Sequence, residues 1–109
     1  MNRAFFGAGQ IAEREMQSGN SPTVIFDNNP ELHGQSFMNL PVLEPSRESL
    51  ANIDQLLICS SSISEITEQC QALGMDRTKI LISDFLGEFA KAHQLESYKF
   101  DGYISCGLP

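Results

Sequence analysis

The residues with the clearest chemical meaning form a glycine-rich run near the amino terminus, residues 7–12, with the sequence GAGQIA. The run follows a short apolar segment and precedes a segment with helical periodicity. At such a junction the first glycine permits a tight turn, the second lets a phosphate approach the backbone, and a small sixth residue lets helix and strand pack closely. The amides of residues 9–11 and the helix dipole would face the anion.

We therefore interpret this run as a phosphate-binding loop. The alternative interpretation is that its glycines only make a short turn between strand and helix. The loop residues predicted to contact a ligand are Gly7, Ala8, Gly9, Gln10 and Ile11.

An acidic residue, Asp27, ends the next apolar segment, roughly 20 residues beyond the first glycine. In dinucleotide-binding folds an acid at this place binds the ribose hydroxyls. Because a carboxylate repels a 2′-phosphate, NAD or a nucleoside-diphosphate sugar fits better than NADP. On this interpretation Asp27→Ala removes only the bonds to ribose. Asp27 also opens the turn Asp-Asn-Asn-Pro, in which Asn28 is a further candidate contact, and the two roles are compatible.

Three serines, Ser60, Ser61 and Ser62, follow another buried segment, residues 55–59. In a doubly wound sheet this segment lies beside the first strand, and a crevice opens between the carboxyl ends of the two. The serines would then form a second polar side that faces the glycine loop. Ser62 and Glu65 also have the spacing of a capping box, so the serines could serve only to begin a helix.

No arrangement of catalytic or metal-binding residues is evident. The two histidines, His33 and His93, are expected to face solvent. The three cysteines are far apart and have no His or Cys neighbour at metal-ligand spacing, so they are expected to be reduced thiols, two of them in the core. Cys59 lacks a neighbouring His or Lys that would lower its pKa, and we expect it to be inert. The sequence thus predicts binding without chemistry.

Apolar periodicity alternates between that of strands and that of helices along the chain, which predicts an α/β protein. Right-handed crossovers then predict a Rossmann-like doubly wound parallel sheet of about five strands, in the order 3-2-1-4-5, with helices on both faces. The expected strands are residues 3–6, 23–26, 40–43, 55–59 and 79–82. The expected helices are residues 10–18, a short one begun by Ser46, 62–73, and a last one from about 85 to 93.

The sequence divides at about residue 95. Residues 1–95 are expected to form the nucleotide-binding domain. Residues 96–109 are expected to be either a tail with a hairpin at Asp101-Gly102 or the start of a following domain of a longer protein.

The composition argues against several other functions. The chain has 109 residues and a formal net charge of −7, with 14 acidic residues against 7 Lys and Arg and no basic cluster, so we expect no binding to nucleic acid. It has no apolar run of the roughly 18–20 residues that a membrane-spanning helix needs, and no signal segment. We therefore expect a cytoplasmic protein without direct membrane insertion.

Several of these segments together resemble a known domain: residues 5–11 (FFGAGQI), residues 25–30 (IFDNNP), Gly34 and residues 40–43 (LPVL). They look like the small Rossmann-like domain at the amino terminus of bacterial surface-sugar enzymes. These enzymes include polysaccharide-biosynthesis epimerases and dehydratases, sugar acyltransferases and FkbM-type methyltransferases. The resemblance covers residues 3–95 and implies a CoA- or NAD-binding module, which in the acyltransferases holds the nucleotide-sugar. It implies ligand contacts at Gly7, Gly9 and Asp27.

Three functions remain open on the sequence alone. The first is a binding domain for NAD or a nucleotide-sugar that works beside a fused catalytic domain or as a homo-oligomer. The second is a fragment of an S-adenosylmethionine-dependent methyltransferase, although the chain is short for one. The third is an interaction or dimerisation module with a degenerate nucleotide site.

Overall fold

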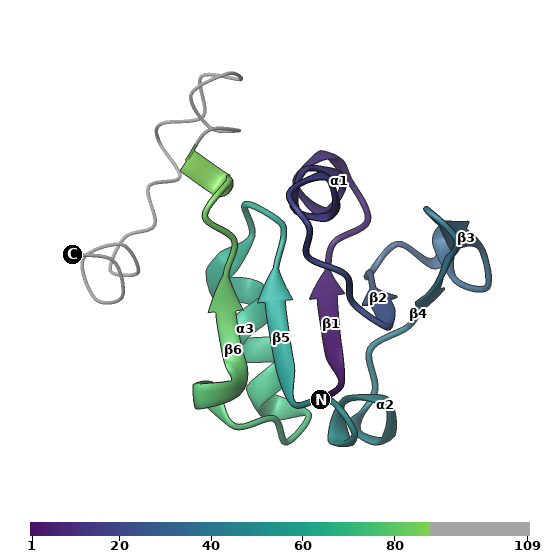
Figure 1. The fold of residues 1–109 in the computed structure, drawn as a ribbon. Helices are drawn as coiled ribbons and strands as arrows, with labels where there is room; N and C mark the ends of the chain where they lie inside the picture. Colours follow the sequence, from purple (N-terminus) through teal and green to yellow (C-terminus); the bar gives the residue numbers. More distant parts are fainter. Residues whose placement is uncertain (88–109) are drawn as a thin grey trace.

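The computed structural model describes residues 1–87, which are coloured in Figure 1. The expected tail and the domain boundary at residue 95 lie outside these residues. Most of the expected helix from about 85 to 93 lies outside them as well. The strands are β1 (Arg3–Phe6), β2 (Val24–Phe26), β3 (Ser36–Phe37), β4 (Leu40–Leu43), β5 (Gln55–Ile58) and β6 (Ile80–Ile82). The helices are α1 (Gln10–Gln17), α2 (Arg47–Ala51) and α3 (Ile63–Ala72), with 3₁₀ turns at Pro30–Leu32 and Arg77–Lys79.

The strands form one mixed sheet in the order β3-β4-β2-β1-β5-β6. All pairs are parallel except β3 with β4, which is antiparallel. The prediction of about five strands in the order 3-2-1-4-5 is therefore wrong in strand count and in the order of the whole sheet. The physical reason is the added edge strand β3. The five strands that were predicted keep the predicted order among themselves, as the parallel set β4-β2-β1-β5-β6. The α/β class and the Rossmann-like arrangement are confirmed.

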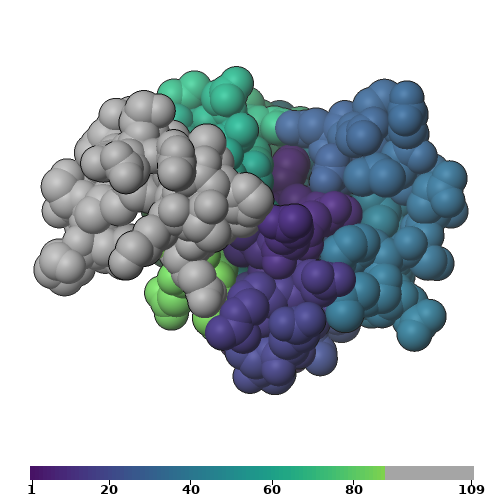
Figure 2. Space-filling model, turned by 90° about the horizontal axis from the view of Figure 1, so that it is seen from above, coloured from purple at the N-terminus to yellow at the C-terminus, as the bar shows by residue number. Residues whose placement is uncertain are grey.

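Helices cover both faces of this sheet. α3 lies behind β5 and β6 in Figure 1, and the view from above in Figure 2 places α1 and α3 on opposite sides. The central strands are accordingly apolar without alternation, and Phe5, Ile25 and Phe26 are at most 1% exposed. β1 and β2 thus lie in the centre of the core, which also includes Leu56 and Ile58 of β5.

The added strand arises from a tight hairpin that the sequence did not reveal. Met38 and Asn39 both have positive φ, of 52° and 69°, and connect Phe37 to Leu40 as a two-residue turn. Positive φ at both positions is the type I′ geometry that matches the twist of paired strands. Asn is a common residue in such a turn, but Met is not. The sequence of this segment therefore carries no clear hairpin signal.

Helix α1 buries an acid among its apolar residues. Ile11, Ala12 and Glu15 are the buried residues of this helix, and Glu15 is only 3% exposed. Its carboxylate accepts hydrogen bonds from the Asn20 side chain and, at 2.5 Å, from the hydroxyl of Ser83 beyond β6. The buried carboxyl group is thus hydrogen-bonded, and it connects α1 to the residues just after β6.

Helix α3 forms within the expected range 62–73, but without the capping box that the sequence suggests. Ile63, Ile66 and Cys70 are buried, while Leu73 is only partly buried against the core. The side chain of Ser62 makes no capping hydrogen bond, so the capping box with Glu65 is wrong. Instead, the hydroxyl of Ser60 accepts a hydrogen bond from the Ser62 amide at 3.2 Å. The serines at this point organise the loop before the helix.

Candidate functional site

The glycine loop leaves β1 by a conformation that only glycine adopts easily. Gly7 has φ of +117°, and its amide donates to the carbonyl of Phe26 at 2.8 Å. A Cβ atom on Gly7 would lie 2.7 Å from the carbonyl oxygen of Cys59, closer than such atoms approach. The first glycine is therefore required by the close approach of this loop to the end of β5.

The second glycine has a different role. Gly9 is the N-cap of α1, in extended conformation with φ of −150°, and a Cβ atom there would meet no atom within 4 Å. Among residues 1–87 no contact therefore requires glycine at this position, and the space beside it is open. Gly9 also offers no side chain to cap the first amides of α1, which leaves these donors to solvent or to a ligand.

Asp27 holds the glycine loop in place. Its Oδ2 atom accepts a hydrogen bond from the Ala8 amide at 2.8 Å, and its Oδ1 atom accepts one from the Asn29 amide at 2.8 Å. The ring of His33 lies against the Asp27 carbonyl, with Nε2 at 2.6 Å from that oxygen. The expectation that Asp27→Ala removes only bonds to ribose is therefore wrong, because the carboxylate already joins β2 to the loop. The half-buried His33 is also less solvent-facing than expected.

Two adjoining pockets open at the carboxyl ends of β1, β2 and β5. One has a volume of about 250 Å³ and lies against the glycine loop, and the other, of about 220 Å³, lies on the side of α3. Gly7, Asp27 and Ser60 line both pockets. Figure 2 looks onto this edge of the sheet from above. The two pockets together form the crevice that the sequence predicts between the loop and the serines.

All ten residues predicted as ligand contacts line this crevice. The loop-side pocket is lined by Gly7, Ala8, Gly9, Gln10, Ile11, Asp27, Cys59, Ser60 and Ser61. The pocket on the side of α3 is lined by Phe6, Gly7, Asp27, Asn28, Ser60, Ser62, Glu65 and Ile66. The structure thus brings the predicted contacts together, and it leaves ligand binding by them as a proposal.

Sequence reasoning missed several residues on the side of α3. Glu65 and Ile66 line the crevice because they lie in the first turn of the helix that follows the serines. Counting one turn from Ser62 would have found them. Asn28 and Gln69 exchange two side-chain hydrogen bonds, of 2.9 and 2.8 Å, that connect the loop after β2 to α3. No local pattern indicates that pairing, because 41 residues separate the two.

The electrostatics of the crevice are acidic. The charged side chains that line it are Asp27 and Glu65, so phosphate charge would be met by backbone amides and the dipole of α1. Burial, with a smaller contribution from the Glu15 carboxylate, raises the pKa of the Cys59 thiol far above its usual value of 9.0. That thiol therefore stays protonated and is not a nucleophile.

Comparison with known proteins places the fold but not the family. No family model and no curated protein matches the sequence. The structure is similar to UDP-D-quinovosamine 4-dehydrogenase from Vibrio fischeri, with a TM-score of 0.62, 15% identity, and 84% of each chain covered. It is also similar to RSP, a Rex-family repressor, with a TM-score of 0.55 and 20% identity over 88% of this chain and 59% of that chain.

RSP has also been solved in complex with β-NAD⁺ and operator DNA, and that structure matches with a TM-score of 0.55 and 17% identity. This match covers 99% of the present chain and 62% of the repressor, so the present chain spans about three fifths of the repressor's length. At such identities the likeness shows a Rossmann-like fold and no more. Among residues 1–87, no helix has the length and apolar character needed to cross a membrane.

Proposed function

We propose that the chain is a nucleotide-binding domain whose ligand lies across the glycine loop. The ligand class that fits is NAD or a nucleoside-diphosphate sugar with an unphosphorylated ribose. The observation that carries this proposal is the open space beside Gly9, next to a helix start without a side-chain cap, in a pocket of about 250 Å³. Glycine at this position serves no contact within the described protein, whereas it would let a phosphate reach the amides.

Each part of the crevice would contact a different part of the ligand. The first amides of α1 would bind the phosphates, with the serines after β5 on the other side. A carboxylate has about four acceptor sites, so Asp27 can hold the Ala8 and Asn29 amides and still accept a ribose hydroxyl. The pocket on the side of α3 combines the apolar Ile66 and Phe6 with polar Asn28 and Ser62, which suits a base.

The structural neighbours support this ligand class. RSP has been solved with β-NAD⁺ and with β-NADH, and the other neighbour is a dehydrogenase of a UDP-sugar. We do not extend the DNA binding of RSP to this chain, because a net charge of −7 opposes contact with phosphate backbones. The expectation of no nucleic-acid partner thus stays a prediction.

We assign no reaction to the domain itself. Its crevice is lined by backbone amides, serine hydroxyls, two carboxylates and a thiol that stays protonated. The described lining residues include no nucleophile paired with a base. Chemistry would therefore belong to a fused catalytic domain or a partner chain, as in the surface-sugar enzymes that the sequence resembles. A fragment of a methyltransferase that uses S-adenosylmethionine is the competing enzyme hypothesis.

One observation favours a second function, an interaction module with a degenerate site. Both charged side chains that line the crevice, Asp27 and Glu65, are acidic and would repel a diphosphate. A chain that folds with this crevice but binds no nucleotide would serve to dimerise or dock.

Isothermal titration calorimetry of the whole chain separates these functions. The ligands are NAD, NADP, a UDP-sugar and S-adenosylmethionine, each at millimolar concentration. We expect heat with NAD or the UDP-sugar and less with NADP. Heat only with S-adenosylmethionine would favour the methyltransferase hypothesis. No heat with any ligand, from a protein with a cooperative unfolding transition, would favour the interaction module.

A further inference from the structure

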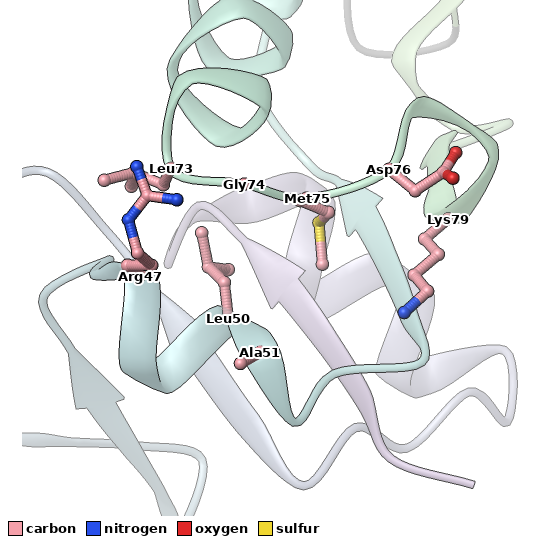
Figure 3. Close-up of a pocket in the computed structure, with 8 residues that line it drawn as sticks. All are labelled: Arg47, Leu50, Ala51, Leu73, Gly74, Met75, Asp76 and Lys79. Carbon is pink, nitrogen blue, oxygen red and sulfur yellow. The ribbon is translucent and has the colours of Figure 1, made fainter.

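Another pocket lies at the opposite edge of the sheet, where β5 and β6 begin. Its volume is about 270 Å³, similar to that of the pocket at the glycine loop. It is formed by α2, by the turn that follows α3 and by the 3₁₀ turn before β6, and Figure 3 shows the eight residues that line it. None of these residues belongs to the nucleotide crevice.

The floor of this pocket is apolar. Leu50 of α2 and Met75 after α3 lie between Arg47 and Lys79 in the view of Figure 3, and they are 3% and 7% exposed. Ala51 and Leu73 extend the apolar lining. A concave apolar surface of this kind suits the aliphatic part of a small molecule.

Two cationic side chains lie at the ends of the pocket, Arg47 on one side and Lys79 on the other (Figure 3). Arg47 is fixed in place, because its Nη2 atom donates to the Ala72 carbonyl at 3.1 Å. A Cβ atom on Gly74 would come within 2.8 Å of Nη1, so the guanidinium lies directly against the backbone after α3. Arginine has five N–H donors in a fixed plane, and the bond to Ala72 uses one of them.

The carboxylate that lines this pocket, that of Asp76, already accepts hydrogen bonds within the protein. Oδ1 of Asp76 accepts hydrogen bonds from the amide and the hydroxyl of Thr78, at 2.8 and 2.7 Å. Two cations and one carboxylate line this pocket, so its side chains carry a net positive charge in a chain whose net charge is −7. A positively charged rim above an apolar floor suits a ligand with an anionic group and an aliphatic chain.

We propose that this pocket binds a small aliphatic carboxylate. The carboxylate group pairs with Arg47, Lys79 adds to the positive field, and the aliphatic chain covers Leu50 and Met75. The site is separate from the nucleotide crevice and does not rest on the proposed function. A purely structural role for Arg47, as a cap for the last carbonyls of α3, would leave the pocket without affinity for such a ligand.

Nuclear magnetic resonance titration of the whole chain tests the proposal with hexanoate as the probe and hexanamide as its uncharged analogue. Hexanoate is expected to shift the amide resonances of Leu50, Gly74 and Met75, and to leave those of the glycine loop in place. Hexanamide is expected to bind more weakly. Equal shifts with the two probes, or hexanoate shifts confined to the glycine loop, would overturn the proposal.

Three variants assign the affinity to the cations. Arg47→Gln is expected to weaken hexanoate binding about 10-fold or more, because hydrogen bonds to a charged group are lost. Lys79→Gln, at an exposed position that leaves the fold intact, is expected to weaken it about 2- to 5-fold. Arg14→Gln removes the same charge from α1, away from this pocket, and is expected to leave hexanoate binding unchanged. If Lys79→Gln and Arg47→Gln both bind as the wild type does, the proposal is wrong.

Discussion

The Oδ2 atom of Asp27 accepts a hydrogen bond from the amide of Ala8 at 2.8 Å, and this bond joins the end of β2 to the loop after β1. The same carboxylate accepts the Asn29 amide through Oδ1. The acid that the sequence assigns to a ligand is therefore also part of the framework that shapes the loop. Binding and stability are linked at this residue.

Asp27→Asn is expected to destabilise the protein as well as weaken ligand binding. The new amide group can accept only one of the two backbone hydrogen bonds, and its NH₂ would face a second donor. We expect a loss of about 1–3 kcal/mol in the free energy of unfolding, measured by urea denaturation. Glu44→Gln, at an exposed position, is the matched control. An unchanged stability in Asp27→Asn would show that the bond to Ala8 contributes nothing to the fold.

The two loop glycines are expected to respond differently to alanine. Gly7→Ala forces a Cβ atom against the Cys59 carbonyl at a φ of +117°, and it should cost about 1–3 kcal/mol or more. Gly9→Ala places its methyl group in open space at an extended φ, and it should cost no more than about 1 kcal/mol, the loss expected when alanine replaces a better N-cap residue. Thermal unfolding of the two variants measures this contrast. Equal destabilisation would contradict the loop geometry.

Thr67→Val is expected to stabilise the protein. The Thr67 side chain is 3% exposed, and within the part of the chain that the structure describes its hydroxyl has no hydrogen-bond partner. Replacing an unpaired buried hydroxyl by a methyl group of similar shape removes a penalty of about 1–3 kcal/mol. Thr67→Ser keeps the hydroxyl and should not stabilise. A Thr67→Val variant that unfolds at lower urea than the wild type would contradict this assignment.

Stability is expected to fall between about pH 9 and pH 11. Burial raises the pKa of the Cys70 thiol from 9.0 to about 11, so the folded chain keeps the proton that the unfolded chain loses above pH 9. The contribution of this thiol is therefore complete below pH 9 and is lost as the pH rises to 11. Urea midpoints across this range should fall less steeply in Cys70→Ala than in the wild type. Parallel slopes would contradict the prediction.

Much of the fold could be predicted because its strands are short apolar runs. Residues 3–6 were expected as a strand and form β1, and the capping of α2 by Ser46 was also expected. The edge strand β3 could not be predicted, because it has two residues and its turn places Met38 at positive φ. A strand of two residues is too short to leave a periodic signal.

The residues of the crevice could be predicted because the carboxyl ends of parallel strands meet at one edge of a sheet. The role of Asp27 in the fold could not, since its bond to Ala8 links two loops 19 residues apart. Glu15 lies between Ile11 and Met16 on the apolar face of α1, but its partner Ser83 is 68 residues away. Its burial was visible only in the folded chain.

The most direct test of nucleotide binding is a calorimetric titration of NAD into the wild-type chain and into Gly9→Val. The valine side chain fills the space beside the first amides of α1, and we expect the fold to persist because no atom of the described residues lies within 4 Å of a Cβ there. Gln17→Val, at an exposed position at the other end of α1, is the control. We expect NAD to bind to the wild type and to Gln17→Val, and not to a folded Gly9→Val. NAD binding of equal affinity in all three proteins would show that the ligand does not lie across the glycine loop.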